Sequence, residues 1–211
     1  MSTSVTGYDK AREAIRERII SLNLAPGSVI DEASLMDQLG LGRTPIREAL
    51  KLLEAENLVV IVPRRGIFVA DIGLNHLQQI YEMRLALEPM AARLAAQRTT
   101  PAHLSQLQLC NGDLEGANSL DIAAAYRVDR AFHRILARST GNELLERSIT
   151  QHYNLALRLW NMVRHWLQVE DIGLMSHLQL IEAISIHDAD RAEAVMRDHV
   201  NRFHNRIRAL L

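Results

Sequence analysis

An aspartate and a histidine interrupt the apolar face of one expected helix in the second half of the chain. Asp129 and His133 lie one turn apart, and their stripe otherwise holds Ile122, Tyr126 and Leu136. Burying a carboxylate without compensation costs several kcal/mol. The Asp129–His133 pair must therefore be neutralised by its own members, by another charge or by a metal ion.

His177 and His199 interrupt two later helical stripes in the same way. One carboxylate oxygen and three imidazole nitrogens suit a divalent metal, zinc first, with nickel, iron and manganese as alternatives, and water or ligand oxygens would complete the coordination. The predicted metal ligands are thus Asp129, His133, His177 and His199. The apolar stripe neighbours are Leu174, Ile181 and Ile184 for His177, and Ala192, Val195, Phe203 and Leu210 for His199.

Each of these histidines, taken singly, also fits the interpretation of a core residue with a satisfied hydrogen bond. Six other histidines show how common the residue is in this chain, and His152 also falls near an apolar stripe. These six are His76, His103, His152, His165, His187 and His204. The identity of the metal stays open, because cellular supply decides it more than the ligand set does.

A long helix is expected to continue to about Arg98, with Asn75 as its N-terminal cap, and Arg84 lies on the apolar stripe of this helix. A buried guanidinium needs a partner. Glu88, one turn further on, is one candidate, and the carboxylate of a small ligand is the other.

A basic helix is expected near residue 45. Thr44 is expected to cap it and Pro45 to take its first position, while Ile46, Ala49, Leu50 and Leu53 form the buried face. Arg47 falls on the opposite face, and Arg43 and Thr44 lie at the N-terminus, where backbone amides favour a phosphate. Such a helix can enter a major groove.

A short hairpin with a basic tip follows this helix. Two strands, over residues 58–62 and 67–70, flank Pro63, Arg64, Arg65 and Gly66. A helix and an arginine-bearing wing suit adjacent DNA grooves. The alternatives are that these arginines are ordinary solvated charges, or that the module binds protein.

The elements that position these residues predict a mainly helical chain. We expect a winged helix-turn-helix of three helices and a β-hairpin over residues 1–70, a linker over 71–75, and an all-helical antiparallel bundle over 76–211. The further helices are expected over residues 8–22, 31–39, 101–114 and 121–139.

The overall composition constrains the function less than the positions of the charged residues do. The net charge of −1 gives no overall attraction to nucleic acid. Arginine supplies 22 of the 24 basic residues, which favours fork-like contacts to phosphates, carboxylates and base edges. The single cysteine, Cys110, is spaced with Leu107, Leu109 and Leu114 and is expected in the core. The lack of a long apolar run and of a secretory signal predicts a cytoplasmic protein without a membrane segment.

The first domain resembles the GntR family of regulators. The resemblance rests on Ala25-Pro26-Gly27, Leu39-Gly40, Arg43 to Leu50, Leu53-Glu54 and Arg65 to Val69. It implies that Arg43, Thr44 and Arg47 contact bases or phosphates and that Arg64, Arg65 and Gly66 form the wing tip. Gly42 departs from the pattern, because the family usually has a serine or threonine there that can touch a phosphate.

The second domain is similar to the FCD ligand-binding domain of FadR-type GntR regulators, from residue 76 to 211. The matching residues are Arg84, Glu88, Asp129, Phe132, His133, Gly141-Asn142, His177, Ala183-Ile184, Asp190, Ala192 and His199. The resemblance implies that Asp129, His133, His177 and His199 hold a divalent metal, and that a small organic acid reaches the metal and Arg84.

The resemblance further implies a homodimer on a palindromic DNA operator, acting as a repressor released by its ligand. A regulator in which the metal itself is the signal is one alternative. A metallohydrolase fused to a DNA-binding module is another, although the sequence has no zincin, nucleophile-elbow or phosphate-loop motif. We therefore expect no catalytic residues and no enzyme activity.

Overall fold

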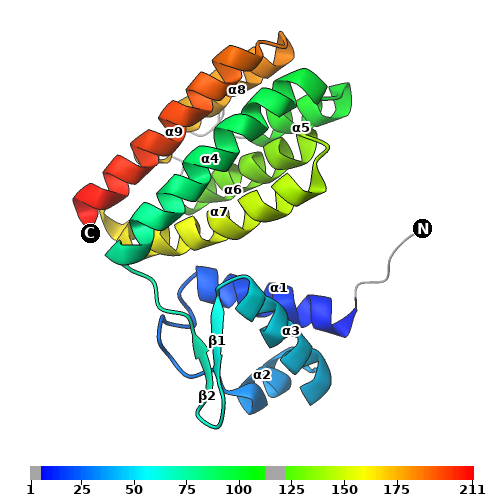
Figure 1. The fold of residues 1–211 in the computed structure, drawn as a ribbon, viewed down its shortest axis with the longest axis vertical. Coiled ribbons are helices and arrows are strands. Elements are labelled where there is room, and N and C mark those ends of the chain that lie inside the picture. Colours follow the sequence, from blue (N-terminus) through cyan, green and yellow to red (C-terminus); the bar gives the residue numbers. More distant parts are fainter. Residues whose placement is uncertain (1–5, 113–121) are drawn as a thin grey trace. The chain divides into compact units, whose positions relative to one another are not determined.

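The computed structural model describes residues 6–112 and 122–211. The chain divides into two compact units, residues 1–73 with 157–162 and residues 74–156 with 163–211. Helices dominate the described residues, and their one sheet is a two-stranded antiparallel hairpin (Figure 1). This architecture confirms the predicted fold class.

Three helices form the body of the first unit: α1 (Gly7–Ile20), α2 (Glu32–Leu39) and α3 (Arg43–Ala55). Capping residues define both ends of α2. The Asp31 carboxylate accepts the Ala33 amide at 2.9 Å and so caps α2, which ends at Gly40 in the left-handed conformation. Apolar side chains from all three helices are buried together: Ala11, Ile15, Ile19, Leu35, Ile46, Ala49, Leu50 and Leu53.

The hairpin consists of β1 (Val59–Val62) and β2 (Gly66–Val69), with Val62 paired to Gly66 and Val59 to Val69. Asn57 ends the preceding helix with a φ of 61°, as its tolerance of the left-handed region predicts. Ile30 donates its amide to the Ile67 carbonyl at 2.8 Å, so the segment before α2 also pairs with β2.

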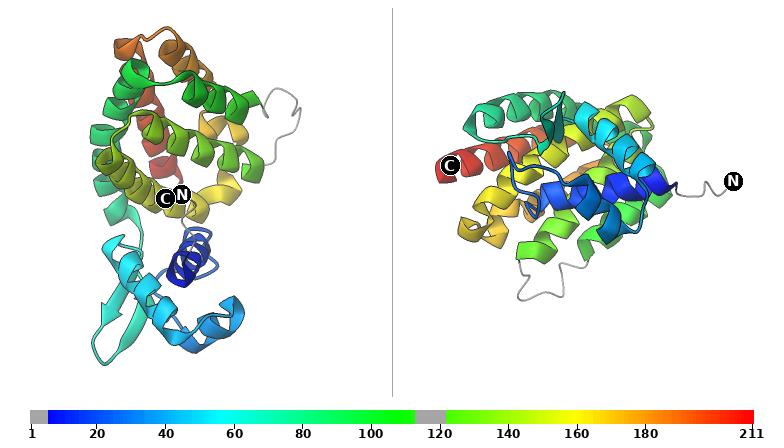
Figure 2. Two further views of the ribbon diagram at one scale, coloured as in Figure 1. Left: turned by 90° about the vertical axis from the view of Figure 1, so that its right-hand side faces the viewer. Right: turned by 90° about the horizontal axis from the view of Figure 1, so that it is seen from below.

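Helices alone form the second unit (Figure 2). α4 and α9 lie side by side and run in opposite directions, while α6 and α8 pack against α4, and α5 packs against α6 and α8. The elements after the hairpin are α4 (Leu74–Arg98), α5 (Pro101–Gly112), α6 (Ile122–Ser139), α7 (Glu143–Val163), the 3₁₀ turns η1 (Arg164–Trp166) and η2 (Val169–Ile172), α8 (Leu174–Ser185) and α9 (Ala189–Leu210).

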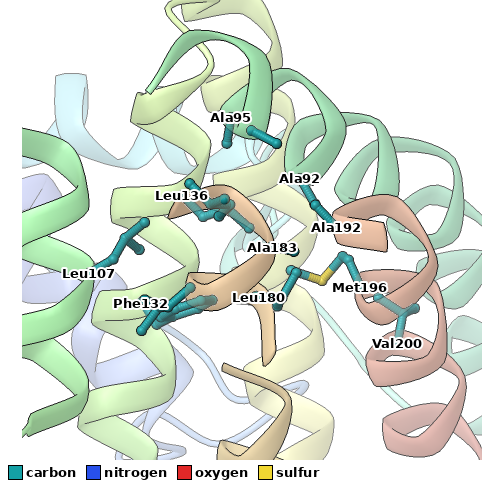
Figure 3. Close-up of a cluster of buried hydrophobic side chains, with 13 residues drawn as sticks. Ala92, Ala95, Leu107, Phe132, Leu136, Leu180, Ala183, Ala192, Met196 and Val200 are labelled. Carbon is teal, nitrogen blue, oxygen red and sulfur yellow. The ribbon is translucent and has the colours of Figure 1, made fainter. Parts of the chain in front are cut away.

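The core of this second unit lies where α4, α5, α6, α8 and α9 meet (Figure 3). Phe132 is its largest fully buried side chain, and small alanines on α4 allow close packing of the helices. None of the described helices is long and apolar enough to cross a bilayer.

Some predicted details are wrong or untested. α4 begins at Leu74, so Asn75 lies inside the helix and does not cap it. Leu174 is only partly buried in the first turn of α8, whereas His177, Ile181 and Ile184 on the same predicted face are buried. Cys110 is only partly buried, at the edge of the core, and Leu109 is exposed. The predicted helix end near Leu114 and helix start at Asp121 lie outside the described residues.

Candidate metal centre and nucleic-acid interface

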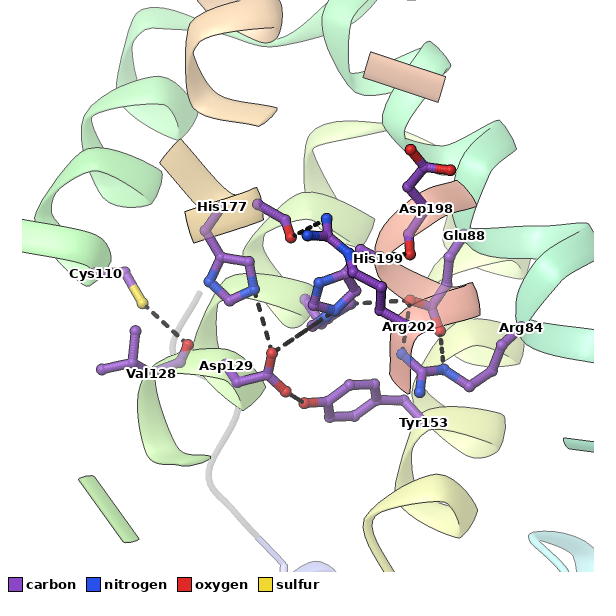
Figure 4. A network of polar contacts seen from close by, with 12 residues as sticks. Arg84, Glu88, Cys110, Val128, Asp129, Tyr153, His177, Asp198, His199 and Arg202 are labelled. Carbon is purple, nitrogen blue, oxygen red and sulfur yellow. Dashed lines mark hydrogen bonds and ion pairs between the residues drawn. The ribbon is translucent and has the colours of Figure 1, made fainter. Parts of the chain in front are cut away.

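Four predicted ligands from three helices meet inside the second unit (Figure 4). Asp129 and His133 come from α6, His177 from α8 and His199 from α9, and one potential ligand atom of each lies within 4.8 Å of all the others. Asp129 Oδ1 lies 3.2 Å from His177 Nε2 and 3.6 Å from His133 Nε2, and the His133 and His199 Nε2 atoms are 3.1 Å apart. The structure therefore brings all four side chains to one point.

The donor atoms fit a small cation. Two atoms that each lie about 2.0–2.1 Å from one zinc ion are separated by roughly 3.3 Å at a tetrahedral angle, which is close to the observed spacings. Asp129 Oδ1 and His177 Nε2 are both buried, and despite their proximity neither makes a hydrogen bond within residues 6–112 and 122–211. Two acceptors that converge without a hydrogen bond are expected where both lone pairs point at a shared cation.

Burial and mutual charge set the protonation of the cluster. Burial opposes ionisation of Asp129, but His133 and His177 outweigh it and hold the Asp129 pKa well below its usual range. Burial disfavours the charged form of His133, yet Glu88 and Asp129 raise its pKa to about 9. Burial lowers the pKa of both His177 and His199, and the charge on His133 lowers each further. Without a metal, His133 is the protonated histidine of the site.

Arg84 and Glu88 form a buried ion pair beside this cluster. Both are 2% exposed; the Arg84 Nε and Nη2 atoms donate to the two Glu88 oxygens, at 2.5 and 3.1 Å. Glu88 Oε2 also lies 3.0 Å from His133 Nδ1, a contact between two helices that apolar periodicity does not predict. Glu88, one of the two partners predicted for Arg84, is therefore its partner in the structure. Arg84 Nη1 makes no hydrogen bond within the described residues.

Tyr153 on α7 is a site residue that sequence analysis missed. Its hydroxyl donates to Asp129 Oδ2, and its ring stacks on His133 with centroids 4.7 Å apart. A signal was present, because Tyr153 follows Leu145 and Ile149 on a buried stripe, and a buried tyrosine hydroxyl needs a partner.

Gly173 confines the His199 ring, and its substitution should weaken the metal centre. Its φ is +76°, and a Cβ at this position would lie 3.1 Å from His199 Nδ1. In Gly173→Ala we expect about 1–2 kcal/mol lower stability, from the left-handed backbone, together with lower metal affinity from a displaced His199. Urea unfolding and a zinc titration measure the two effects.

Gly141→Ala is the matched control for this substitution. Gly141 also has a positive φ, +64°, but no atom of the described residues lies within 4 Å of the added Cβ. This variant should lose stability and keep its metal affinity. Equal zinc affinity in both variants and the wild type would contradict a role for Gly173 in placing His199.

The predicted DNA-contacting residues of α3 lie on its exposed side. Arg43, Thr44 and Arg47 are exposed, and Ile46, Ala49, Leu50 and Leu53 are buried, as predicted. The predicted cap is wrong: Gly42 is the N-cap and makes no side-chain cap bond, so Thr44 lies in the first helical turn. Arg47 Nε donates to Glu32 Oε2 at 2.8 Å, and this exposed ion pair is screened by water and salt.

The hairpin tip carries the other predicted DNA contacts. Arg64, Arg65 and Gly66 are exposed. Arg64 adopts a φ of 63° and Gly66 a φ of 121°, and the Arg65 amide donates to Val62 O at 3.0 Å. This tight turn projects two arginines that have no acidic partner within residues 6–112 and 122–211.

Comparisons with known proteins match both units to one kind of protein. Residues 7–69 match the gntR family of bacterial regulatory proteins, and residues 79–202 match the FCD domain. The regulator McbR of Escherichia coli is 30% identical over 188 residues, covering 89% of this chain and 74% of McbR. The Nta operon transcriptional regulator of Aminobacter aminovorans is 28% identical over 193 residues, covering 89% of this chain and 88% of the relative.

Solved structures show the same fold. The E. coli McbR/YncC structure matches with a TM-score of 0.85 at 22% identity, over 98% of this chain and 99% of the other. A putative GntR regulator from Rhodococcus sp. RHA1 matches with a TM-score of 0.77 at 16% identity, over 97% and 98% of the two chains. These families and relatives are transcription regulators and not enzymes. The chain belongs to the GntR family of DNA-binding bacterial transcription regulators, with an FCD ligand-binding domain after its winged helix-turn-helix.

Proposed function

We propose that this regulator is a cytoplasmic homodimeric repressor that is released from a palindromic operator when a small carboxylate binds a divalent metal in its helical unit. The observation that carries this proposal is the convergence of Asp129, His133, His177 and His199. Asp129 Oδ1 and His177 Nε2 are buried there and make no hydrogen bond in the described part of the chain. The relative GlaR of E. coli, 29% identical, is named a repressor, which supports the direction of control.

Arg84 would bind the carboxylate of the effector. Glu88 occupies two of its donor groups, and Arg84 Nη1 is left without a hydrogen bond in the described structure. The Arg84 guanidinium carbon also lies over two aromatic rings, 4.6 Å from the Phe203 centroid and 5.3 Å from that of Tyr153. A rigid buried cation with one unused donor suits an anionic ligand group.

Arg43, Thr44, Arg47, Arg64, Arg65 and Gly66 would contact the operator. Their exposure on α3 and the hairpin tip is what a groove-binding helix and wing require. Differential binding of the effector to two arrangements of the dimer would then change operator affinity by about 1–3 kcal/mol, as in typical allosteric proteins.

The number of protein ligands favours a second candidate, in which the metal itself is the signal or is structural. Three histidines and one aspartate fill a tetrahedral zinc site completely, and sites that act on ligands usually keep an open position. Effector binding at the metal therefore requires five or six coordination. Zinc accepts a fifth ligand, whereas nickel, iron and manganese favour higher coordination.

Thermal unfolding of metal-stripped protein reloaded with zinc, nickel or manganese, with and without small mono- and dicarboxylic acids, tests the proposal. A bound species at a hundredfold excess over its Kd should add about 2.7 kcal/mol of stability. We expect one metal to stabilise the protein and one class of acid to add to that effect. The matched variants are His199→Ala, which should lose both effects, and His204→Ala, which removes another buried α9 histidine and should keep them.

Each result has a distinct meaning. Stabilisation by metal with no addition from any acid would support the second candidate. No stabilisation of the wild type by any metal, or equal stabilisation of His199→Ala, would contradict both.

A further inference from the structure

His133 has both ring nitrogens engaged on opposite sides. Nδ1 faces Glu88 Oε2 at 3.0 Å, and Nε2 faces Asp129 and His199. Glu88 is itself fixed, because both of its oxygens accept from Arg84. An anchored carboxylate on Nδ1 leaves Nε2 as the nitrogen that can bind a metal, and it makes the imidazole a stronger ligand.

Asp129 has one oxygen engaged and one unused. Oδ2 accepts a hydrogen bond from the Tyr153 hydroxyl, while Oδ1 faces the three imidazoles and makes no hydrogen bond to any described residue. Tyr153 is 5% exposed and its ring stacks on His133, so the hydroxyl is held in place by packing. A carboxylate whose second oxygen is already bound by a donor presents a single oxygen to a cation.

His177 lacks such support. Its Nδ1 is buried without a hydrogen bond in the described part of the chain, and its ring is held by stacking on Phe132, with centroids 3.9 Å apart and an interplanar angle of 4°. Hydrogen-bonded support is thus present at the two α6 residues, Asp129 and His133, and absent from His177 in the described structure.

We propose that Glu88 and Tyr153 are positioning residues of the metal centre, which make His133 bind through Nε2 and Asp129 through Oδ1 alone. This inference rests on the proposed metal site. Tyr153 prevents two-oxygen binding by Asp129 and thereby leaves one more coordination position for the carboxylate of an effector. Glu88 strengthens His133 as a ligand and couples it to Arg84.

Metal titrations of Tyr153→Phe and Glu88→Gln test the two roles. Zinc affinity is measured against a chromophoric chelator at one pH for all variants, because metal affinity depends on pH. Each variant should bind zinc about 10- to 100-fold more weakly than wild type, as is typical for loss of an outer partner. In Tyr153→Phe the visible spectrum of bound Co²⁺ should also weaken, because Asp129 then adds a second oxygen and raises the coordination number.

The control variants remove a tyrosine hydroxyl and a glutamate charge outside the proposed metal site. Tyr81→Phe deletes a hydroxyl that donates to Asn201, and Glu82→Gln neutralises an exposed carboxylate on the same helix as Glu88. Both should match the wild type. Circular dichroism and metal-free melting identify misfolding; if Glu88→Gln misfolds, Glu88→Asp replaces it, because the shorter carboxylate retracts from Nδ1 and should weaken zinc binding too.

The outcomes separate this inference from the proposed function. If wild type binds one metal and Tyr153→Phe and the Glu88 variant bind it with unchanged affinity and an unchanged Co²⁺ spectrum, the positioning roles are wrong and the metal site stands. If the wild type binds neither zinc nor cobalt, the proposed function fails and this inference fails with it. A purely structural role would lower the melting temperature and leave affinity and spectrum unchanged.

Discussion

Metal-stripped protein should lose about 3 kcal/mol of unfolding free energy as the pH rises from 6.5 through 9, because His133 loses its proton over that range. The folded-state pKa of about 9 lies above the ordinary value of 6.5. A group of this kind stabilises the folded state fully below pH 6.5, and the stabilisation disappears as the pH passes the folded-state pKa. Urea unfolding across this range, with a chelator present, measures the loss.

The other buried titratable groups of the site do not change their contribution to stability between pH 6.5 and 9. The pKa values of His177 and His199 are lowered, mainly by burial, so their contributions fall with decreasing pH below 6.5. Burial and Asp129 raise the pKa of Tyr153 well above 10. The metal-free protein should therefore be most stable near pH 6.5.

Adding zinc should reverse the slope, because a metal binds the deprotonated imidazole and its affinity rises with pH. His133→Gln should flatten the dependence in the metal-free protein, and His76→Gln, which removes an exposed histidine, should leave it intact. A flat profile in the wild type, or a persistent slope in His133→Gln, would show that Glu88 and Asp129 do not hold a proton on His133.

Apolar periodicity predicted most helices well, since burial of one face dominates helix placement. It correctly put His133, His177 and His199 on inward faces, because each lies within a run of buried neighbours. It was wrong at helix ends, such as Thr44 and Asn75, where a residue that can cap need not be the residue that does.

Periodicity identifies which residues are buried but not which of them meet. Glu88 and His133 lie on different helices, 45 positions apart, and their contact depends on how α4 packs on α6. The same holds for Tyr153 and Asp129, which are 24 positions apart. The four predicted ligands stood out because each interrupts an apolar stripe and because each matches the FCD pattern, whereas Tyr153 does not interrupt its stripe. Whether the cluster holds a metal stays a prediction.

Arg47→Ala should remove most of the preference of this regulator for its operator. Arg47 is exposed near the start of α3, and a bidentate arginine–guanine contact typically discriminates between bases by roughly tenfold to a hundredfold. The ion pair of Arg47 with Glu32 does not prevent this contact, because an exposed ion pair contributes little free energy and can be replaced by a DNA contact. Affinities for a duplex selected from a random library, and for an unrelated duplex, measure the ratio.

Arg65→Ala should behave differently, because we expect the exposed arginines of the hairpin tip to bind phosphates and not base edges. It should weaken binding to both duplexes alike and reduce the slope of log affinity against log salt by about one. Arg147→Ala, which removes an exposed arginine paired with Glu143 on α7, gives the same change in charge and should alter neither quantity. If Arg47→Ala keeps the full affinity ratio while Arg65→Ala reduces it, sequence is recognised by the wing, and α3 serves to position the protein on the DNA backbone.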